Sequence, residues 1–359
     1  MVHTVEDSQL ARAAAFDPAA ALANPDRQVL MALPTIDIAP FVGDSSRAER
    51  ERVAAEIRRA SIDLGFFYVT GHGIDRAELA GTLASGHRFF ELPFAEKMKI
   101  AARNSPANLG FIQTGGLNPE DNPDKNPDLK ERLYLSRALA PGEALDEASP
   151  AGRSQWPEET VLPGFRPAME AATARMVALA RAMSRAFGLS LGLPEDALER
   201  YHDRMGCIHS FNYYPPTTAT QEQAWGFSPH TDYGSFTILL QDESGGLQTR
   251  NAAGDWVEVP PVPDTFVVNV GDLLARWTND LYVSALHRVI NRGTEARLSV
   301  SFFAYANPRA EIATLETCIS PARPSRYEPV IAGDYIRELL TQAYRTGRSG
   351  MSARTAGRL

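Results

Sequence analysis

The side chains best able to do chemistry are His230 and Asp232, two residues apart, and His287, which follows much later in the chain. Side chains two residues apart lie on one face of a strand, so we expect a strand to point His230 and Asp232 at a common metal ion. We expect His287 to reach the same ion from a second, distant strand. Two imidazoles and one carboxylate would cover one face of an octahedral ion and leave three positions open, an arrangement typical of non-haem Fe(II) sites.

The identity of the metal does not follow from these ligands alone. Two His and one Asp also suit Zn, Ni or Cu, and the general affinity order places Fe(II) below all three. Each residue also has an ordinary structural explanation, because a single His on a strand is usually a hydrogen-bonded core or surface residue. Cys207 and His209 share a strand face as well, and for that pair we favour plain packing over metal binding.

A second group, Arg297 and Ser299, alternates on one face of a candidate strand. An Arg guanidinium can bind a carboxylate through two parallel hydrogen bonds, and a neighbouring hydroxyl can add a third. The ordinary alternative for Arg297 is a surface salt bridge. Asn212 and Tyr214 alternate in the same way on an earlier candidate strand, where core packing is the alternative.

Short motifs are spread over most of the chain, from about Leu33 to Pro308. In order they are Leu33–Asp37, Gly65–Ile74, Asp128–Glu131, Phe211–Pro215, His230–Asp232, Gly246–Gln248, Asn269–Asp272, Leu286–Val289 and Arg297–Ser299. In type and order they resemble the isopenicillin N synthase-like family of Fe(II)/2-oxoglutarate-dependent oxygenases. No particular member of the family can be named from them.

This resemblance implies a function as well as a fold. The family oxidises a C–H bond of a small molecule by hydroxylation, desaturation or ring chemistry, with Fe(II), 2-oxoglutarate and O2, and releases succinate and CO2. It implies that His230, Asp232 and His287 bind the iron and that Arg297 and Ser299 hold the distal carboxylate of 2-oxoglutarate. The resemblance also implies that Tyr214 and Asn212 approach this co-substrate.

The walls of the substrate site are predicted less sharply. Phe303 continues the strand face of Arg297 and Ser299, and it resembles an aromatic residue that borders the substrate in plant members of the family. Phe111, Tyr134 and a C-terminal helix around residues 335–344 are weaker candidates. For each of these three, ordinary packing is the simpler interpretation.

Two other functions stay open at this point. The nearer alternative is an iron oxidase of the same fold that uses no 2-oxoglutarate, because some such oxidases also keep an Arg-x-Ser pair. The further alternative is a non-catalytic, metal-binding β-barrel, since a fold alone does not fix a function. Release of succinate from 2-oxoglutarate in the presence of O2 separates the first from the proposed oxygenase, and consumption of O2 separates the second.

The amino-acid composition limits the kinds of binding partner and the cellular compartment that we expect. The chain has 359 residues and a net charge of −8, so we expect no broad nucleic-acid surface. Its two cysteines do not make a disulfide scaffold and suit a reducing, cytoplasmic compartment. We expect no membrane span and no secretory signal, because no apolar run is long enough and the first thirty residues are acidic and broken by prolines. A small-molecule substrate is the default, and the oligomeric state cannot be read from the sequence.

The positioning elements follow from changes in periodicity. Helical spacing predicts helices at 8–15, 46–63, 76–90 and 166–187, and short apolar or alternating runs predict strands at 65–69, 208–213, 236–241, 256–259, 265–270, 283–291 and 297–305. Residues 103–127 and 138–164 are expected to be loops. The expected class is mainly β with flanking helices, as a double-stranded β-helix, also described as a cupin-like jelly roll. We divide the chain into a loosely ordered leader (1–31), a mixed N-terminal region (32–165), a catalytic core (166–309) and a C-terminal helix and tail (310–359).

Overall fold

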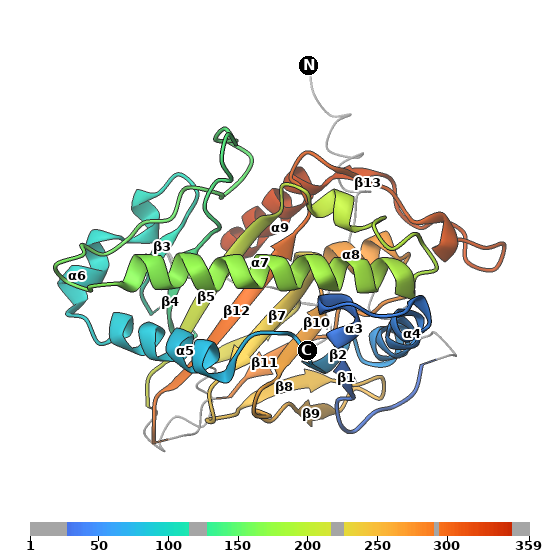
Figure 1. The fold of residues 1–359 in the computed structure, drawn as a ribbon, viewed down its shortest axis with the longest axis horizontal. Coiled ribbons are helices and arrows are strands. Elements are labelled where there is room, and N and C mark those ends of the chain that lie inside the picture. Colours follow the sequence, from blue (N-terminus) through green and yellow to red (C-terminus); the bar gives the residue numbers. More distant parts are fainter. Residues whose placement is uncertain (1–26, 115–127, 217–225, 291–293, 347–359) are drawn as a thin grey trace.

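Two β-sheets and a layer of helices make up the computed structural model, which describes residues 27–114, 128–216, 226–290 and 294–346 (Figure 1). The strand order of the larger sheet is β1-β2-β10-β7-β12-β5-β4-β3, and that of the smaller sheet is β6-β11-β8-β9. The strands of the larger sheet are β1 (Thr35–Asp37), β2 (Phe66–Thr70), β3 (Gly110–Ile112), β4 (Glu131–Leu135), β5 (Gly206–Tyr214), β7 (Phe236–Gln241), β10 (Phe266–Val270) and β12 (Arg297–Tyr305).

The other described elements are the smaller sheet, a separate pair of strands and the α-helices. The smaller sheet holds β6 (Phe227–His230), β8 (Leu247–Arg250), β9 (Trp256–Glu258) and β11 (His287–Val289). A separate pair is formed by β13 (Glu311–Ile312) and β14 (Val330–Ile331). The α-helices are α3 (Ala39–Val42), α4 (Arg47–Asp63), α5 (Arg76–Phe90), α6 (Phe94–Lys99), α7 (Phe165–Ser190), α8 (Asp272–Trp277) and α9 (Ala332–Thr346).

The helix α4 begins directly after its N-cap residue Ser46. The hydroxyl of Ser46 accepts a hydrogen bond from the Glu49 backbone N–H, and the Glu49 carboxylate accepts one from the Ser46 backbone N–H. This reciprocal pair satisfies donors that the first turn of a helix leaves free. The structure contains the helices predicted at 46–63, 76–90 and 166–187, as α4, α5 and α7. The helix predicted at 8–15 lies outside the described residues.

Helix α7 covers one face of the larger sheet and runs across its strands (Figure 1). Its side chain Thr173 hydrogen-bonds His209 of β5, and Phe187 packs against Phe236 of β7 at a ring-centroid distance of 5.2 Å. Tyr213 of β5 stacks on Phe90 of α5 in the same layer. Because side chains alternate along a strand, the even-numbered residues of β5 point to the opposite face.

That opposite face of the larger sheet meets the smaller sheet. Phe66 of β2 makes an edge-to-face contact with His287 of β11, with ring centroids 5.2 Å apart. Long antiparallel pairing of β12 with β5 places Arg297 opposite Tyr214 and Ser299 opposite Asn212. We call this side of the larger sheet the inward face, and the side covered by α4, α5 and α7 the helix face.

The strand predictions differ in accuracy for physical reasons. β7 and β12 have the predicted bounds, because their runs are long and regular. Within the described part of the predicted strand at 283–291, only His287–Val289 is a strand, and the N–H of Val283 instead donates to the carbonyl of Ser61 in α4. The predicted loop at 103–127 contains β3, whose Gly110–Ile112 pairs with β4. β3 and β4 lie in the same sheet as β5, although the predicted boundary at residue 165 separates them along the chain. The division of the chain into four regions stays a prediction.

Candidate metal and co-substrate site

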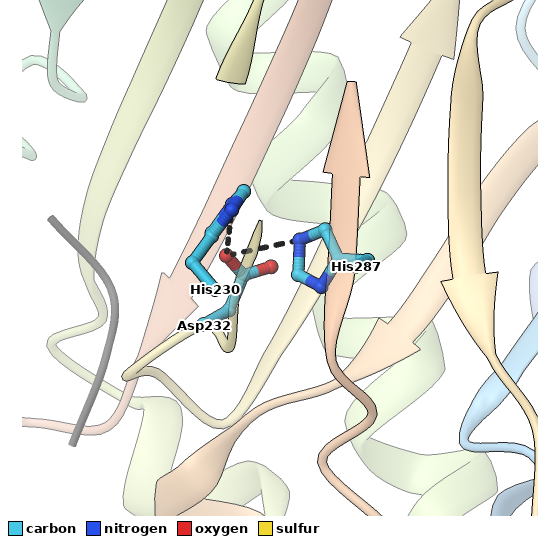
Figure 2. A group of neighbouring side chains, drawn as sticks. All are labelled: His230, Asp232 and His287. Carbon is cyan, nitrogen blue, oxygen red and sulfur yellow. Dashed lines mark ion pairs between the residues drawn. The ribbon is translucent and has the colours of Figure 1, made fainter. Parts of the chain in front are cut away.

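Three buried side chains converge between the two sheets (Figure 2). The Nε2 atom of His230 lies 3.9 Å from Oδ1 of Asp232, and Nε2 of His287 lies 3.6 Å from the same oxygen. The three ligand atoms all lie within 4.8 Å of one another, a spacing that could accommodate one metal ion. Within the described ranges, this is the only such group of three or more His, Cys, Asp or Glu residues.

Asp232 reaches this cluster in a different way from the one expected. Strand β6 ends at His230, so Asp232 lies beyond it and strand alternation does not place its carboxylate. The backbone of the β10–α8 turn holds the segment instead, because the N–H of Asp272 donates to the Asp232 carbonyl over 2.7 Å. This close approach requires a glycine at 271, where a Cβ atom would lie 2.2 Å from the carbonyl oxygen of Gly234.

Both imidazoles are fixed in the tautomer that a metal ligand needs. Nδ1 of His230 lies 2.7 Å from the carbonyl oxygen of Ser228, and Nδ1 of His287 lies 3.1 Å from that of Ala285. A carbonyl oxygen only accepts, so each Nδ1 must carry the proton and each neutral ring presents a lone pair on Nε2. Burial, aided by the nearby His287 and Lys130, lowers the pKa of His230 well below its usual value, which keeps this ring neutral.

The carboxylate of Asp232 is oriented through its second oxygen. Oδ2 accepts hydrogen bonds from the hydroxyl of Thr237 at 2.5 Å and from the side-chain amide of Asn269 at 2.8 Å. Oδ1 is therefore the oxygen that faces the two histidines. Hydrogen bonds of this kind fix the direction of a ligand and tune its basicity.

This donor set fits a divalent metal ion. The two Nε2 lone pairs face a carboxylate oxygen, and three acceptors this close repel one another unless a cation lies between them. Two imidazoles and one carboxylate also leave part of the coordination sphere for other ligands. The geometry alone does not select iron over zinc, nickel or copper.

Arg297 forms the second part of the site on the inward face of β12. Its exposed fraction is 1%, and its guanidinium donates to the Gly245 carbonyl at 2.6 Å, the Gln241 side chain at 3.1 Å and the Ser299 hydroxyl at 3.1 Å. The guanidinium carbon lies 4.8 Å from the ring centre of Tyr214. None of these three acceptors is a carboxylate, so Arg297 is a buried cation held by neutral groups rather than part of a surface salt bridge.

The remaining predicted site residues have different surroundings. Burial raises the pKa of Tyr214, so its phenol keeps the proton and can donate a hydrogen bond. Asn212 faces inward, but its amide is engaged by Ser210 and by the hydroxyl of Ser301 at 3.3 Å. Phe303 also lies on the inward face and is half-buried.

The structure gives no support to the weaker prediction that Phe111 contacts the substrate. Phe111 is opposite Leu133, and Leu133 is opposite Phe211, so all three side chains belong to the helix face. The ring of Phe111 lies 6.2 Å from those of Phe89 in α5 and Phe94 in α6. Ordinary packing accounts for these contacts.

His209 and Cys207 also lie on the helix face and show no metal chemistry. Nδ1 of His209 hydrogen-bonds the hydroxyl of Thr173 at 2.8 Å, and burial lowers the pKa of His209 to about 3. Burial likewise raises the pKa of the Cys207 thiol, which disfavours the thiolate that metals bind. The packing interpretation of this pair agrees with the structure.

Sequence reasoning assigned no role to several residues that the structure places at the site. Thr237 and Asn269 orient Asp232, and Gln241 supports Arg297. Lys130 is buried close enough to His230 to influence its pKa. The only available signal was that Lys130 and Asn269 occur within the family-like motifs Asp128–Glu131 and Asn269–Asp272. Thr237 and Gln241 gave no signal beyond strand alternation.

Family comparisons agree with this architecture. The sequence model of the 2OG-Fe(II) oxygenase superfamily matches residues 206–305, which contain the three converging residues and Arg297. The model described as non-haem dioxygenase in morphine synthesis N-terminal matches residues 33–159.

No helix in the described part of the chain has the length and apolar character needed to cross a membrane.

Individual relatives cover nearly the whole chain. The 2-oxoglutarate-Fe(II) type oxidoreductase ppzC of Metarhizium majus is 33% identical over 326 residues, 86% of this chain and 86% of that protein. Homoarginine-6-hydroxylase 2-ODD-233 of Oryza sativa subsp. japonica is 33% identical over 324 residues, 86% of this chain and 97% of that protein.

A solved structure extends this likeness to the fold. The structure of a full-length Neurospora crassa protein in complex with alpha-KG, which is 2-oxoglutarate, and thymine has a TM-score of 0.78 and 26% identity. It covers 90% of this chain and 99% of its own. The expected double-stranded β-helix is therefore confirmed, and the chain belongs to the isopenicillin N synthase-like branch of the 2OG-Fe(II) oxygenases as a 2-oxoglutarate-dependent dioxygenase.

Proposed function

We propose that His230, Asp232 and His287 are the ligands that hold Fe(II) in this dioxygenase. The observation that carries the proposal is the meeting of two Nε2 lone pairs and one free carboxylate oxygen within 4.8 Å, in buried positions. The bound iron would supply activation of O2, coupled to oxidative decarboxylation of 2-oxoglutarate to succinate and CO2. The residues of the chain supply orientation, since Ser228, Ala285, Thr237 and Asn269 fix the three ligands before the metal arrives.

We propose that Arg297 and Ser299 hold the distal carboxylate of 2-oxoglutarate. The guanidinium lies on the inward face at the end of β12 and is 1% exposed, so a carboxylate there is shielded from water. Shielding strengthens a charge-assisted hydrogen bond, and the fork of Arg suits both carboxylate oxygens. The protonated Tyr214 beside it can donate a further hydrogen bond to the carboxylate. We assign Asn212 only a weak contact with the co-substrate, because its side-chain amide already has side-chain and backbone partners.

We propose a small molecule as the substrate, oxidised at a C–H bond beside the metal, with Phe303 as part of the wall. Phe303 is half-buried on the inward face, along the same strand as Arg297 and Ser299. The Neurospora crassa protein was solved with thymine, a molecule of this size class. A cytoplasmic location suits Cys207 and Cys318, both buried free thiols.

The experiment measures O2-dependent release of succinate from 2-oxoglutarate by the Fe(II)-loaded full chain. Asp232→Ala should reduce release to the background of metal alone, because one ligand is lost, while circular dichroism and thermal unfolding show a retained fold. Asp334→Ala is the matched control, since this aspartate is 67% exposed on α9 and should leave release unchanged. Full activity in Asp232→Ala would overturn the ligand assignment, and succinate-independent O2 uptake would favour the oxidase without 2-oxoglutarate.

A further inference from the structure

Two lysines are buried in the described part of the chain, Lys97 in α6 and Lys130 just before β4, and they differ in their hydrogen bonds. Lys97 is 6% exposed, and its ammonium donates to Glu131 at 2.6 Å and to the carbonyl of Phe90 at 3.0 Å. Lys130 is 2% exposed, and its Nζ has no hydrogen-bond partner among the described residues. A buried amino group without a hydrogen-bond acceptor is costly, so an acceptor on a bound molecule would stabilise it.

The carboxylate nearest to Lys130 does not fill that need. Oδ2 of Asp128 lies 3.9 Å from Nζ, beyond hydrogen-bond distance, and Oδ1 of Asp128 accepts from the backbone N–H of Ser228 at 2.8 Å. Asp128 is therefore held by the strand that carries His230. It forms a long ion pair with Lys130 but gives the ammonium group no hydrogen bond.

Lys130 lies next to the proposed metal site. Its ammonium group is placed over the ring of Phe227, and that ring stacks on His230 with centroids 3.6 Å apart. Alternation along β4 sends Arg132 and Tyr134 to the same inward face, opposite Asn212 and Ser210 of β5. Arg132 donates to the Tyr134 hydroxyl at 2.8 Å, and both side chains remain partly exposed, so solvent reaches this side of the site.

Among the described residues whose charges most influence Lys130, positive charge exceeds negative charge. Protonated Lys130, Arg132 and Arg297 are three cations, and Asp128 and Asp232 are two anions. The charges of Fe(II) and of doubly ionised 2-oxoglutarate cancel each other, so an excess of one positive charge remains when both are bound. Burial lowers the pKa of Lys130 well below its usual value, which means that the cation is unfavourable until negative charge arrives beside it.

We propose that Lys130 binds a carboxylate of the substrate, so that the substrate of this dioxygenase is a monoanionic small molecule. This inference rests on the proposed function, because the charge balance includes iron and 2-oxoglutarate. A carboxylate at Nζ gives the buried ammonium group its missing acceptor and removes the excess charge. It also fixes one end of the substrate one aromatic ring away from His230, which orients the rest of the molecule relative to the metal.

The test compares acids with neutral molecules of the same shape. The probes are benzoate and benzamide, and acetate and acetamide, added without O2 to the full chain saturated with Fe(II) and 2-oxoglutarate, so that Arg297 is already occupied. Binding is measured from the shift in melting temperature and from the change in visible absorption of the iron complex. The wild type should bind a carboxylate at least about tenfold more tightly than its amide, the usual worth of a charge-assisted hydrogen bond.

Lys130→Met should abolish this preference, and Lys99→Met should keep it. Lys99 is the matched control because its side chain is 52% exposed and its ammonium group pairs with Glu96 at 2.8 Å. Lys130→Met should melt at the same or a higher temperature than the wild type, because methionine has a similar length and removes a buried amino group that lacks a hydrogen-bond acceptor among the described residues. A merely structural lysine would instead lose stability on this substitution.

Three results would overturn the proposal. They are a wild type without preference for either carboxylate, a Lys130→Met variant that keeps the preference, and a Lys130→Met variant that instead binds 2-oxoglutarate more weakly. The last would assign Lys130 to the co-substrate. These failures differ from failure of the proposed function, because a wild type that releases succinate normally but ignores the probes keeps the function and loses only this inference.

Discussion

The two faces of strands β5 and β12 differ in the partners that their buried polar side chains find within the protein. On the helix face, His209 is neutral and bonded to Thr173, and Phe211 is fully buried. On the inward face, the buried guanidinium of Arg297 donates to neutral groups, and Lys130, just before the adjacent β4, has no hydrogen-bond partner among the described residues. The helix face is largely apolar and supplies stability, whereas we propose that metal, co-substrate and substrate complete the inward face.

Removing a large side chain from the helix face should have the largest effect on stability. Phe211→Ala should lower the free energy of unfolding by about 3–5 kcal/mol, because it leaves a cavity beside α5 and α7. The half-saturating concentration of 2-oxoglutarate, measured on the folded fraction, should not change. Chemical denaturation and succinate assays check both parts. A raised 2-oxoglutarate requirement without loss of stability would break the distinction between the faces.

Substituting the buried guanidinium should show the reverse pattern. Arg297→Leu should weaken 2-oxoglutarate binding by about 2–5 kcal/mol, roughly 30-fold or more, because one partner of a buried charged pair is lost. Stability without co-substrate should change much less. Arg297→Lys is the matched variant that keeps the charge and loses the fork, so its affinity should be intermediate. Titration calorimetry measures the affinity, and an unchanged value in Arg297→Leu would refute the co-substrate role.

A hydroxyl that orients the carboxylate ligand should matter less than the ligands themselves. Thr237→Val removes the hydrogen bond to Oδ2 of Asp232 and leaves the one from Asn269. The affinity for Fe(II) should fall by about 10- to 100-fold. Thr237→Ser keeps the hydroxyl and should bind iron like the wild type. Equal affinities in Thr237→Val and Thr237→Ser would show that this contact does not act on the metal.

Acid should weaken the helix-side core through a buried neutral histidine. His202 bonds the Leu198 carbonyl and the Ser235 hydroxyl, and burial lowers its pKa to about 4 from the usual 6.5. The unfolded chain binds the proton first, so this stability is present above pH 6.5 and is lost as the pH falls toward 4. The slope from this group is at most about 1.4 kcal/mol per pH unit. His202→Gln should show a shallower slope in denaturation, and an identical slope would exclude His202 as the cause.

The sequence was most informative where chemistry or long periodicity is local. The identity of the three converging residues follows from the few side chains that bind metals and from their context in a family-like order. The bounds of β7 and β12 were correct because each run alternates or stays apolar over its whole length. The predicted helix at 46–63 matches α4 to within one residue, because Ser46 is its N-cap and its helical spacing continues to Asp63.

The sequence did not predict the structural features that depend on contacts between residues far apart in the chain. Asp232 is positioned by Gly271 and Asp272 rather than by strand alternation, and nothing near it in the chain announces this. Strand β8 and helix α8 are short, so their local patterns are weak. Lys130 looks like an ordinary lysine in sequence, because only the folded arrangement shows that Lys97 takes Glu131 and leaves Lys130 without an acceptor.

The most direct measurement is an anaerobic titration of the metal-free chain with Fe(II), in the presence of 2-oxoglutarate. The wild type should bind one iron per chain and develop the visible absorption of an iron–2-oxoglutarate complex. His230→Ala, Asp232→Ala and His287→Ala should each lose stoichiometric binding while still unfolding cooperatively. Undiminished binding of one iron in all three variants would contradict the central claim that these side chains form the metal site.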